Sequence, residues 1–115
     1  MLIVDDDESL RKALDRTIRL AGFEVEAFAS AEALLAHGIP EGDVCLVLDL
    51  DLPGIDGLQC KRKLADAGRD LPTIFITALG PGEVGESLAA AAPVAVLYKP
   101  FKKEDLLEAI GRACK

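Results

Sequence analysis

The chain has 115 residues, of which half are hydrophobic and only 4% aromatic, and this suits a single domain with an aliphatic core. Its formal net charge of −7 argues against direct binding to nucleic acid, because phosphate contacts need clustered lysines and arginines. We find no secretory signal and no apolar stretch long enough to cross a membrane, so a cytoplasmic protein is expected.

The hydrophobic pattern predicts five strands that alternate with five helices. The expected strands are Leu2–Val4, Glu24–Phe28, Val44–Leu48, Pro72–Ile76 and Val94–Leu97. Each is followed by a helix, over about 8–21, 30–36, 57–67, 80–92 and 103–113. Strands that alternate with helices predict a parallel sheet with right-handed crossovers and helices on both faces.

Local signals support several of these boundaries. Asp7 and Ser30 are suitable N-caps for the first two helices, and Gly22 is a good stop for the first. In the third helix, Leu58, Leu64 and Ala65 should face inward. The fourth helix should be poorly formed, because glycines weaken its start.

The cysteines give no sign of a metal site or a disulfide framework. Cys45, Cys60 and Cys114 are an odd number without metal-like spacing. Cys45 falls in a predicted buried strand and is expected to act as a small core hydrophobe. Reduced thiols therefore fit better than disulfides.

The stretch Val44–Gly57 organises the rest of the chain. Its five apolar residues are typical of a strand buried on both faces, and they end in Asp49, with Asp51 two places on. Asp49 is the first charged side chain at the carboxyl end of this strand. In open parallel α/β sheets that edge is where ligands bind.

Other polar residues follow the neighbouring strands and should converge on Asp49. Asp5 and Asp6 follow the first strand, Thr77 the fourth and Lys99 the fifth. Such acids repel one another unless a hard cation neutralises them, and ligands that are all oxygen suit Mg²⁺. A lysine and a hydroxyl can steady the oxygens of a phosphoryl group, and a carboxylate can accept one. The pattern predicts phosphoryl transfer onto an acid.

Four short motifs lie at the predicted strand ends. They are V-D-D at Val4–Asp6, D-x-x-L-P-G at Asp49–Gly54, I-T-A at Ile76–Ala78 and K-P-F at Lys99–Phe101. In this order they resemble a response-regulator receiver domain, over essentially the whole chain. The resemblance implies a flavodoxin-like, doubly wound α/β fold with a five-stranded parallel sheet of order 2-1-3-4-5 and five helices. It also implies one receiver domain over residues 1–115, with no effector domain in the chain.

The resemblance implies a role for each acid. Asp49 would be the phosphoacceptor, supplied by a sensor histidine kinase or a phosphotransfer protein. Mg²⁺ would be held directly by Asp6 and Asp49, by Asp5 through water, and by the backbone carbonyl of Asp51. The protein would be a regulator rather than an enzyme, although it would assist its own phosphorylation and dephosphorylation.

The resemblance also implies how the domain switches. Thr77 would hydrogen-bond to the phosphoryl group, Lys99 would pair with Asp49 or its phosphate, and the peptide bond before Pro100 would be cis. Receivers usually turn an aromatic of the fifth strand inward as the threonine loop moves. Val96 occupies that position here, so we expect a muted or differently wired aromatic switch.

The implied partners are a kinase or phosphotransfer protein and an output partner, and a homodimer is compatible with the family. Nucleic acid and membrane are not expected to bind this chain directly.

Two alternatives stay open at this point. A degenerate receiver could serve as an interaction module independent of phosphorylation, because Val96 replaces the aromatic. Asp49 and Asp51 also resemble the D-x-D start of haloacid-dehalogenase-type phosphatases, although Asp5 and Asp6 would then have no role. A G-x-G-x-x-G match at Gly80–Gly85 lacks the acid that a dinucleotide site needs after the next strand.

Overall fold

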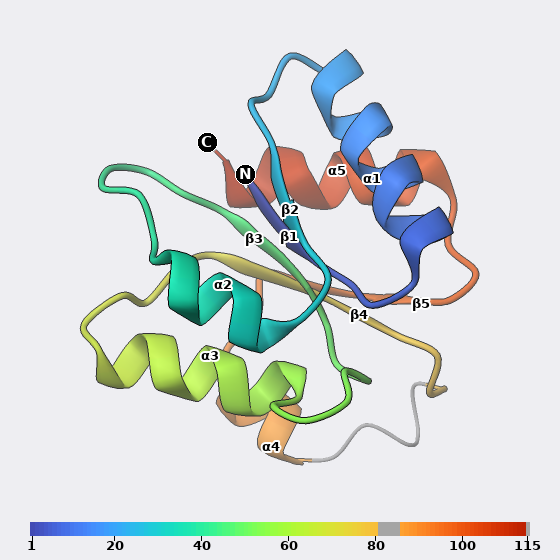
Figure 1. Ribbon diagram of the computed structural model, residues 1–115. Coiled ribbons are helices and arrows are strands. Elements are labelled where there is room, and N and C mark those ends of the chain that lie inside the picture. The colour runs from blue at the N-terminus through green and yellow to red at the C-terminus, as the bar shows by residue number, and fades with distance from the viewer. Residues whose placement is uncertain (81–85, 115) are drawn as a thin grey trace.

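A parallel sheet of five strands runs through the centre of the molecule (Figure 1). The computed structural model describes residues 1–80 and 86–114. The strands in these ranges are β1 (Leu2–Val4), β2 (Glu26–Phe28), β3 (Leu46–Asp49), β4 (Thr73–Thr77) and β5 (Ala95–Tyr98). Their spatial order is β2-β1-β3-β4-β5 and all neighbours are parallel, which confirms the predicted sheet.

Helices cover both faces of the sheet, as the alternating pattern predicted. They are α1 (Glu8–Leu20), α2 (Ala31–His37), α3 (Gly57–Asp66), α4 (Glu86–Ala90) and α5 (Lys103–Ala113). Helices α1 and α5 lie on one face, and α2, α3 and α4 lie on the other (Figure 1). None of the helices within residues 1–80 and 86–114 has the length and hydrophobicity needed to cross a bilayer.

Two hydrophobic cores result from the alternation of side chains along the strands. Val47 and Ile74 point into the core beneath α1 and α5. Leu46, Leu48 and Phe75 point into the core beneath α2 and α3. The central strands therefore need apolar residues at successive positions, which explains the uninterrupted run in β3.

Side-chain caps fix where the first two helices begin. Asp7 accepts hydrogen bonds from the backbone N–H groups of Ser9 and Leu10, at 3.0 and 3.3 Å. Ser30 accepts one from Ala33 at 3.0 Å. Both predicted caps are confirmed, and each satisfies donors that a helix start leaves free.

The predictions were less accurate for α4 and for the inner face of α3. Helix α4 ends at Ala90, two residues before the predicted end at residue 92, and most of its predicted start lies outside the described residues. The glycine-rich stretch with the G-x-G-x-x-G match includes residues 81–85, which lie outside the described residues. On α3, Ala65 is exposed, and Cys60 and Lys61 face inward instead. The buried lysine is a side chain that hydrophobic periodicity cannot anticipate.

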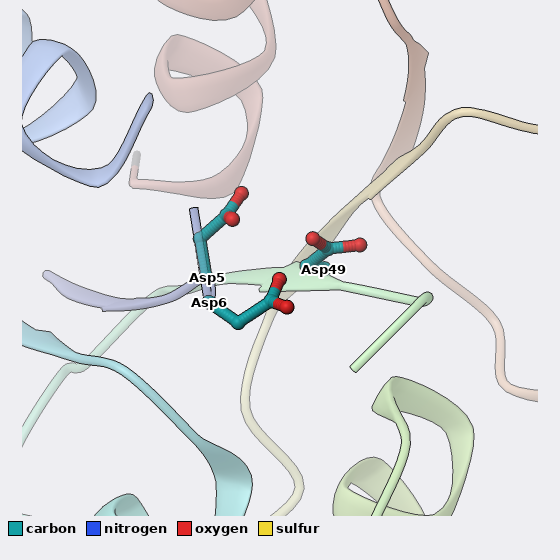
Figure 2. Close-up of side chains that lie close together, drawn as sticks. All are labelled: Asp5, Asp6 and Asp49. Carbon is teal, nitrogen blue, oxygen red and sulfur yellow. The ribbon is translucent and has the colours of Figure 1, made fainter. Parts of the chain in front are cut away.

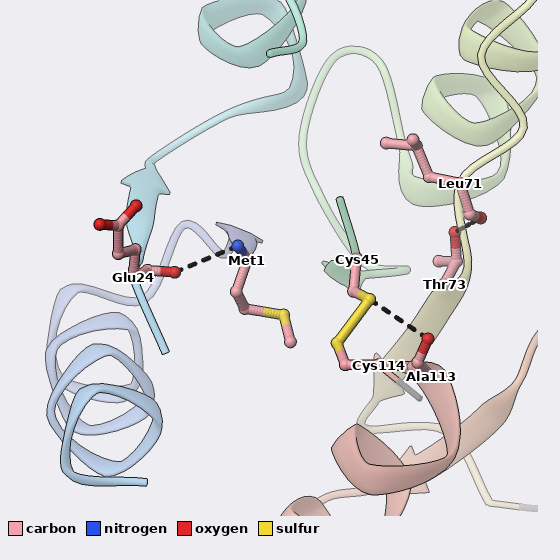
Figure 3. The surroundings of a disulfide bond; sticks show 7 residues. All are labelled: Met1, Glu24, Cys45, Leu71, Thr73, Ala113 and Cys114. Atoms are coloured by element: carbon pink, nitrogen blue, oxygen red, sulfur yellow. Dashed lines mark hydrogen bonds between the residues drawn. A yellow bond between two sulfur atoms is a disulfide. The ribbon is translucent and has the colours of Figure 1, made fainter. Parts of the chain in front are cut away.

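One pair of cysteines corrects the prediction of reduced thiols. Cys45 and Cys114 form a disulfide with a Cα–Cα separation of 6.4 Å, although 69 positions separate them in the sequence (Figure 3). Cys60 is a free, buried thiol. Cys45 is buried as expected. The fold returns the end of α5 to the start of β3, and residue spacing alone does not show this proximity.

Candidate functional site

Three of the predicted acids meet at the carboxyl ends of β1 and β3. One carboxylate oxygen from each of Asp5, Asp6 and Asp49 lies within 4.8 Å of those from the other two. Figure 2 shows the three side chains gathered there. The parallel register pairs Val4 with Leu48, so the residues that follow each strand lie side by side. Asp5 and Asp49 are buried and Asp6 is exposed.

Asp49 is held at both carboxylate oxygens. Its Oδ1 accepts a hydrogen bond from the backbone N–H of Asp51 at 2.8 Å, and its Oδ2 accepts one from Lys99 Nζ at 3.1 Å. Gly57 lies close behind, because a Cβ atom there would lie 2.5 Å from the Asp49 backbone oxygen and 2.9 Å from Leu50 Cα. A glycine at this position lets α3 begin directly against the end of β3.

Asp5 has one satisfied and one unsatisfied oxygen. Oδ1 accepts a hydrogen bond from the Asp7 N–H at 2.8 Å, whereas the buried Oδ2 has no hydrogen-bond partner among the described residues. Burial raises the pKa of Asp5 to about 6, and the negative charges of Asp49 and Asp6 add to this increase. The hydrogen bond from the Asp7 N–H and the positive charge of Lys99 act in the opposite direction. A buried oxygen without a donor, beside two further acids, suits a bound cation.

Lys99 places a positive charge against the carboxylates of two of these acids. Its Nζ lies 3.1 Å from Asp49 Oδ2 and 3.8 Å from Asp5 Oδ2. Burial lowers the pKa of Lys99, but the hydrogen bond to Asp49 and the charges of Asp49, Asp5 and Asp51 outweigh it and raise the pKa above its usual value. The peptide bond between Lys99 and Pro100 is cis. One ammonium thus interacts with the carboxylates of Asp49, Asp5 and Asp51, and negative charge is in excess.

Thr77 lies buried at the end of β4 and contacts Asp51, to which the sequence assigned a role for the backbone carbonyl only. Its hydroxyl donates to Asp51 Oδ2 at 3.2 Å and accepts from the Leu79 N–H at 3.0 Å. The Ala78 N–H donates to the same Asp51 oxygen at 3.0 Å. We expected Asp51 to act through its backbone carbonyl, and that role stays a prediction. In the structure its carboxylate contacts the loop after β4. The signal in the sequence that could have indicated this contact is the presence of an acid two positions after Asp49.

Val96 and Tyr98 lie on β5 beside β4. Val96 pairs in register with Phe75 and packs against the core beneath α2 and α3. Tyr98 pairs with Thr77 and is half-buried. Leu97 faces the other core, the one beneath α1 and α5. The position where an aromatic was expected from the family therefore holds a small, partly buried aliphatic side chain.

Comparison with known proteins decides the family. The profile described as "Response regulator receiver domain" matches residues 1–111. The chain belongs to this family. The family prediction is confirmed, and the haloacid-dehalogenase alternative is wrong, because this assignment covers nearly the whole chain. Receivers act as regulators, and the sheet order above is the one expected for them.

Relatives of this receiver support the assignment. It is 40% identical to Nodulation protein W of Bradyrhizobium diazoefficiens, and the match covers 98% of this chain and 50% of that protein. It is 39% identical to Response regulator protein TmoT of Ectopseudomonas mendocina, with coverage of 98% and 51%. The receiver thus spans about half the length of these curated relatives.

Solved structures agree with the fold. The receiver resembles response regulator StyR with a TM-score of 0.89 and 39% identity, covering 97% of this chain and 57% of that one. It resembles FixJ-N with a TM-score of 0.87 and 37% identity, covering 97% and 90%. It also resembles the BeF₃-activated receiver domain of DrrB, with a TM-score of 0.83 and 27% identity. That match covers 96% of this chain and 92% of the other.

Proposed function

We propose that this receiver is a Mg²⁺-dependent phosphoacceptor switch in which Asp49 takes a phosphoryl group from a sensor histidine kinase or a phosphotransfer protein. One observation carries the proposal. Asp49 is a buried carboxylate at the carboxyl end of the central strand, with one oxygen held by the Asp51 amide and the other by Lys99. Two further acids stand next to it.

The metal would be held by the acids at the ends of β1 and β3. Asp6 and Asp49 would bind it directly, Asp5 through water, and Asp51 through its backbone carbonyl. The unpartnered buried oxygen of Asp5 and the excess of negative charge support this assignment, since hard cations prefer such oxygen donors. When bound, Mg²⁺ would supply positive charge beside the oxygens of the incoming phosphoryl group.

The transfer step conserves atoms and charge. An oxygen of the Asp49 carboxylate forms a bond to phosphorus, and the phosphorus–nitrogen bond of the donor phosphohistidine breaks. The imidazole leaves with the electron pair of that bond, and Asp49 becomes an acyl phosphate. Lys99 would pair with the new phosphoryl oxygens, and Thr77 would hydrogen-bond to them. Both contacts would stabilise the negative charge on the phosphoryl group.

The output would be a change of surface driven by charge. An acyl phosphate brings up to two negative charges where one stood, and it biases a two-state arrangement of the surrounding loops. Residues 1–115 would act as one receiver domain that controls an output partner. Because Val96 is small, we expect this switch to depend less on an aromatic side chain than in most relatives.

Mass spectrometry of the intact protein tests the proposal. Wild type treated with acetyl phosphate should gain one phosphoryl group with Mg²⁺ and none with EDTA. Asp49→Asn should lose the adduct completely, because the amide is no nucleophile. Asp70→Asn is a matched control, since it neutralises an exposed acid that contacts Lys61 rather than Lys99, and it should be labelled like wild type.

The other outcomes separate the alternatives. A Mg²⁺-dependent adduct that persists in Asp49→Asn would overturn the assignment of the phosphoacceptor. Failure of wild type to form any adduct, with acetyl phosphate left unconsumed, would favour the degenerate receiver that acts only by binding.

A further inference from the structure

The contact of Asp51 with the loop after β4 uses the Thr77 hydroxyl, which the proposed function assigns to the phosphoryl group. Thr77 has a single hydroxyl proton, which it donates to Asp51 Oδ2, and its oxygen already accepts from the Leu79 N–H. The N–H of Ala78 donates to the same Asp51 oxygen. Both donors at the end of β4 are therefore committed to one carboxylate.

We propose that Asp51 is a positioning residue whose carboxylate occupies the phosphoryl-binding donors of Thr77 and Ala78, so that it must leave them before the phosphorylated state can form. The inference rests on the proposed function. It assigns to Asp51 a side-chain role separate from that of its backbone carbonyl. The contact of the Asp51 carboxylate with these donors would slow phosphorylation and weaken the binding of phosphoryl mimics.

The chemistry of the donors supports this competition. A carboxylate oxygen and a phosphoryl oxygen are both anionic acceptors, and both favour a hydroxyl and a backbone N–H as donors. The Thr77 hydroxyl can donate to one of them at a time. Asp51 holds its place through the sheet register, which sets Asp49 beside Ile76 and so brings the segments after both strands together.

Electrostatics gives the carboxylate a reason to leave. Phosphorylation of Asp49 would place further negative charge two residues from Asp51, whose own N–H is bonded to Asp49 Oδ1. Like charges at this separation repel. Because Asp51 is an exposed residue, its carboxylate can turn into water, where hydration replaces the hydrogen bonds that it gives up. The Thr77 hydroxyl and the Ala78 N–H would then be free for phosphoryl oxygens.

Binding of beryllofluoride, a phosphoryl mimic, measures the competition directly. The chain has no tryptophan, so calorimetry at saturating Mg²⁺ is the suitable method. Asp51→Ala should bind beryllofluoride about tenfold more tightly than wild type, the effect of freeing donors from one charge-assisted contact. Asp51→Asn, which keeps an acceptor oxygen but loses the charge, should fall between them.

A second measurement does not depend on phosphorylation or on its mimic. In metal-free buffer, hydrogen exchange of the Ala78 amide should be faster in Asp51→Ala, because that N–H loses its acceptor. Asp43→Ala is the control, because it removes one charge from an exposed acid before the amino end of β3, away from the site. It should change neither the exchange of the Ala78 amide nor the affinity for beryllofluoride.

The outcomes distinguish this inference from the proposed function. If wild type binds beryllofluoride and accepts phosphate on Asp49, while Asp51→Ala binds no more tightly than wild type, only the competition is wrong. Unchanged exchange at Ala78 would likewise overturn the contact on which it depends. If wild type neither binds beryllofluoride nor accepts phosphate, the proposed function fails and this inference fails with it.

Discussion

The lysine–aspartate pairs Lys99–Asp49 and Lys61–Asp70 differ in which partner is buried. In the site, Lys99 lies 3.1 Å from Asp49, and the lysine side chain is 25% exposed while the acid is 2% exposed. At the far end of α3, Lys61 lies 2.8 Å from Asp70, and here the lysine is 8% exposed while the acid is 83% exposed. The acid is therefore the buried partner in the site, and the lysine is the buried partner in the second pair.

The second pair is electrostatically complete. Lys61 donates to Asp70 Oδ1 and, at 2.6 Å, to the backbone carbonyl of Leu71. The hydrogen bond from Lys61 and then its charge lower the pKa of Asp70. One ammonium meets one carboxylate, and the buried lysine makes two hydrogen bonds. This pair supports the turn after α3 and leaves nothing for a ligand to neutralise.

The pair in the site is incomplete. Lys99 faces the buried acids Asp5 and Asp49 together, and one Asp5 oxygen has no hydrogen-bond partner in the described part of the chain. Burial raises the pKa of Asp5 to about 6, and the negative charge of Asp49 adds to the increase. A lysine–aspartate contact therefore does not by itself mark a functional site. The excess of buried negative charge does, because it costs stability that a bound cation can return.

The largest effect on stability should come from removing that excess at Asp5. Its pKa is raised from 3.8 to about 6, so the folded state binds more protons than the unfolded state between these values. Stability without metal should therefore fall as pH rises from about 4 to about 6. Asp5→Asn should abolish this dependence and stabilise the metal-free protein at pH 7.5 by about 3 kcal/mol, since each pKa unit corresponds to about 1.4 kcal/mol.

Urea unfolding in EDTA at several pH values measures this effect. Mg²⁺ should stabilise wild type more than it stabilises Asp5→Asn, because the variant loses a carboxylate near the metal. Equal stability of the two proteins across the pH range would show that the acids are not in electrostatic conflict.

Lys61→Met should have the next largest effect on the free energy of unfolding, and it should destabilise the protein. The substitution keeps a long apolar side chain but removes a buried donor to the Leu71 carbonyl. Thr73 still donates to that carbonyl at 2.9 Å, so the loss should be about 1–2 kcal/mol. Urea unfolding measures it, and phosphorylation by acetyl phosphate should be unchanged. A large loss of phosphorylation in a folded variant would contradict the separation of the two pairs.

Asp70→Asn should have the smallest effect. Because the pKa of Asp70 is lowered, its contribution is present above the ordinary value near 4 and is lost as pH falls through the folded value. Its exposure makes that contribution small. Thermal unfolding from pH 7 to pH 3 should show a slightly weaker acid dependence in the variant. A variant that is less stable than Lys61→Met would reverse the proposed roles of the two partners.

The sequence was most informative where a local pattern implies a local structure. Apolar runs predicted the strands of the sheet, and the caps at Asp7 and Ser30 are confirmed because capping depends on backbone donors a few residues away. The ends of parallel strands share one edge, so placing Asp5 and Asp49 at strand ends was enough to bring them together. The assigned roles of these acids stay predictions.

Only the tertiary structure decided the remaining contacts. The Cys45–Cys114 disulfide joins residues 69 positions apart, and the Asp51 carboxylate meets Thr77 across two loops. The burial of Lys61 depends on how the turn after α3 folds back onto that helix. Periodicity states which face of an element is apolar, and strand order states which ends meet. The direction of a polar side chain in a loop is set by the packing of several elements at once, which no single stretch of sequence contains.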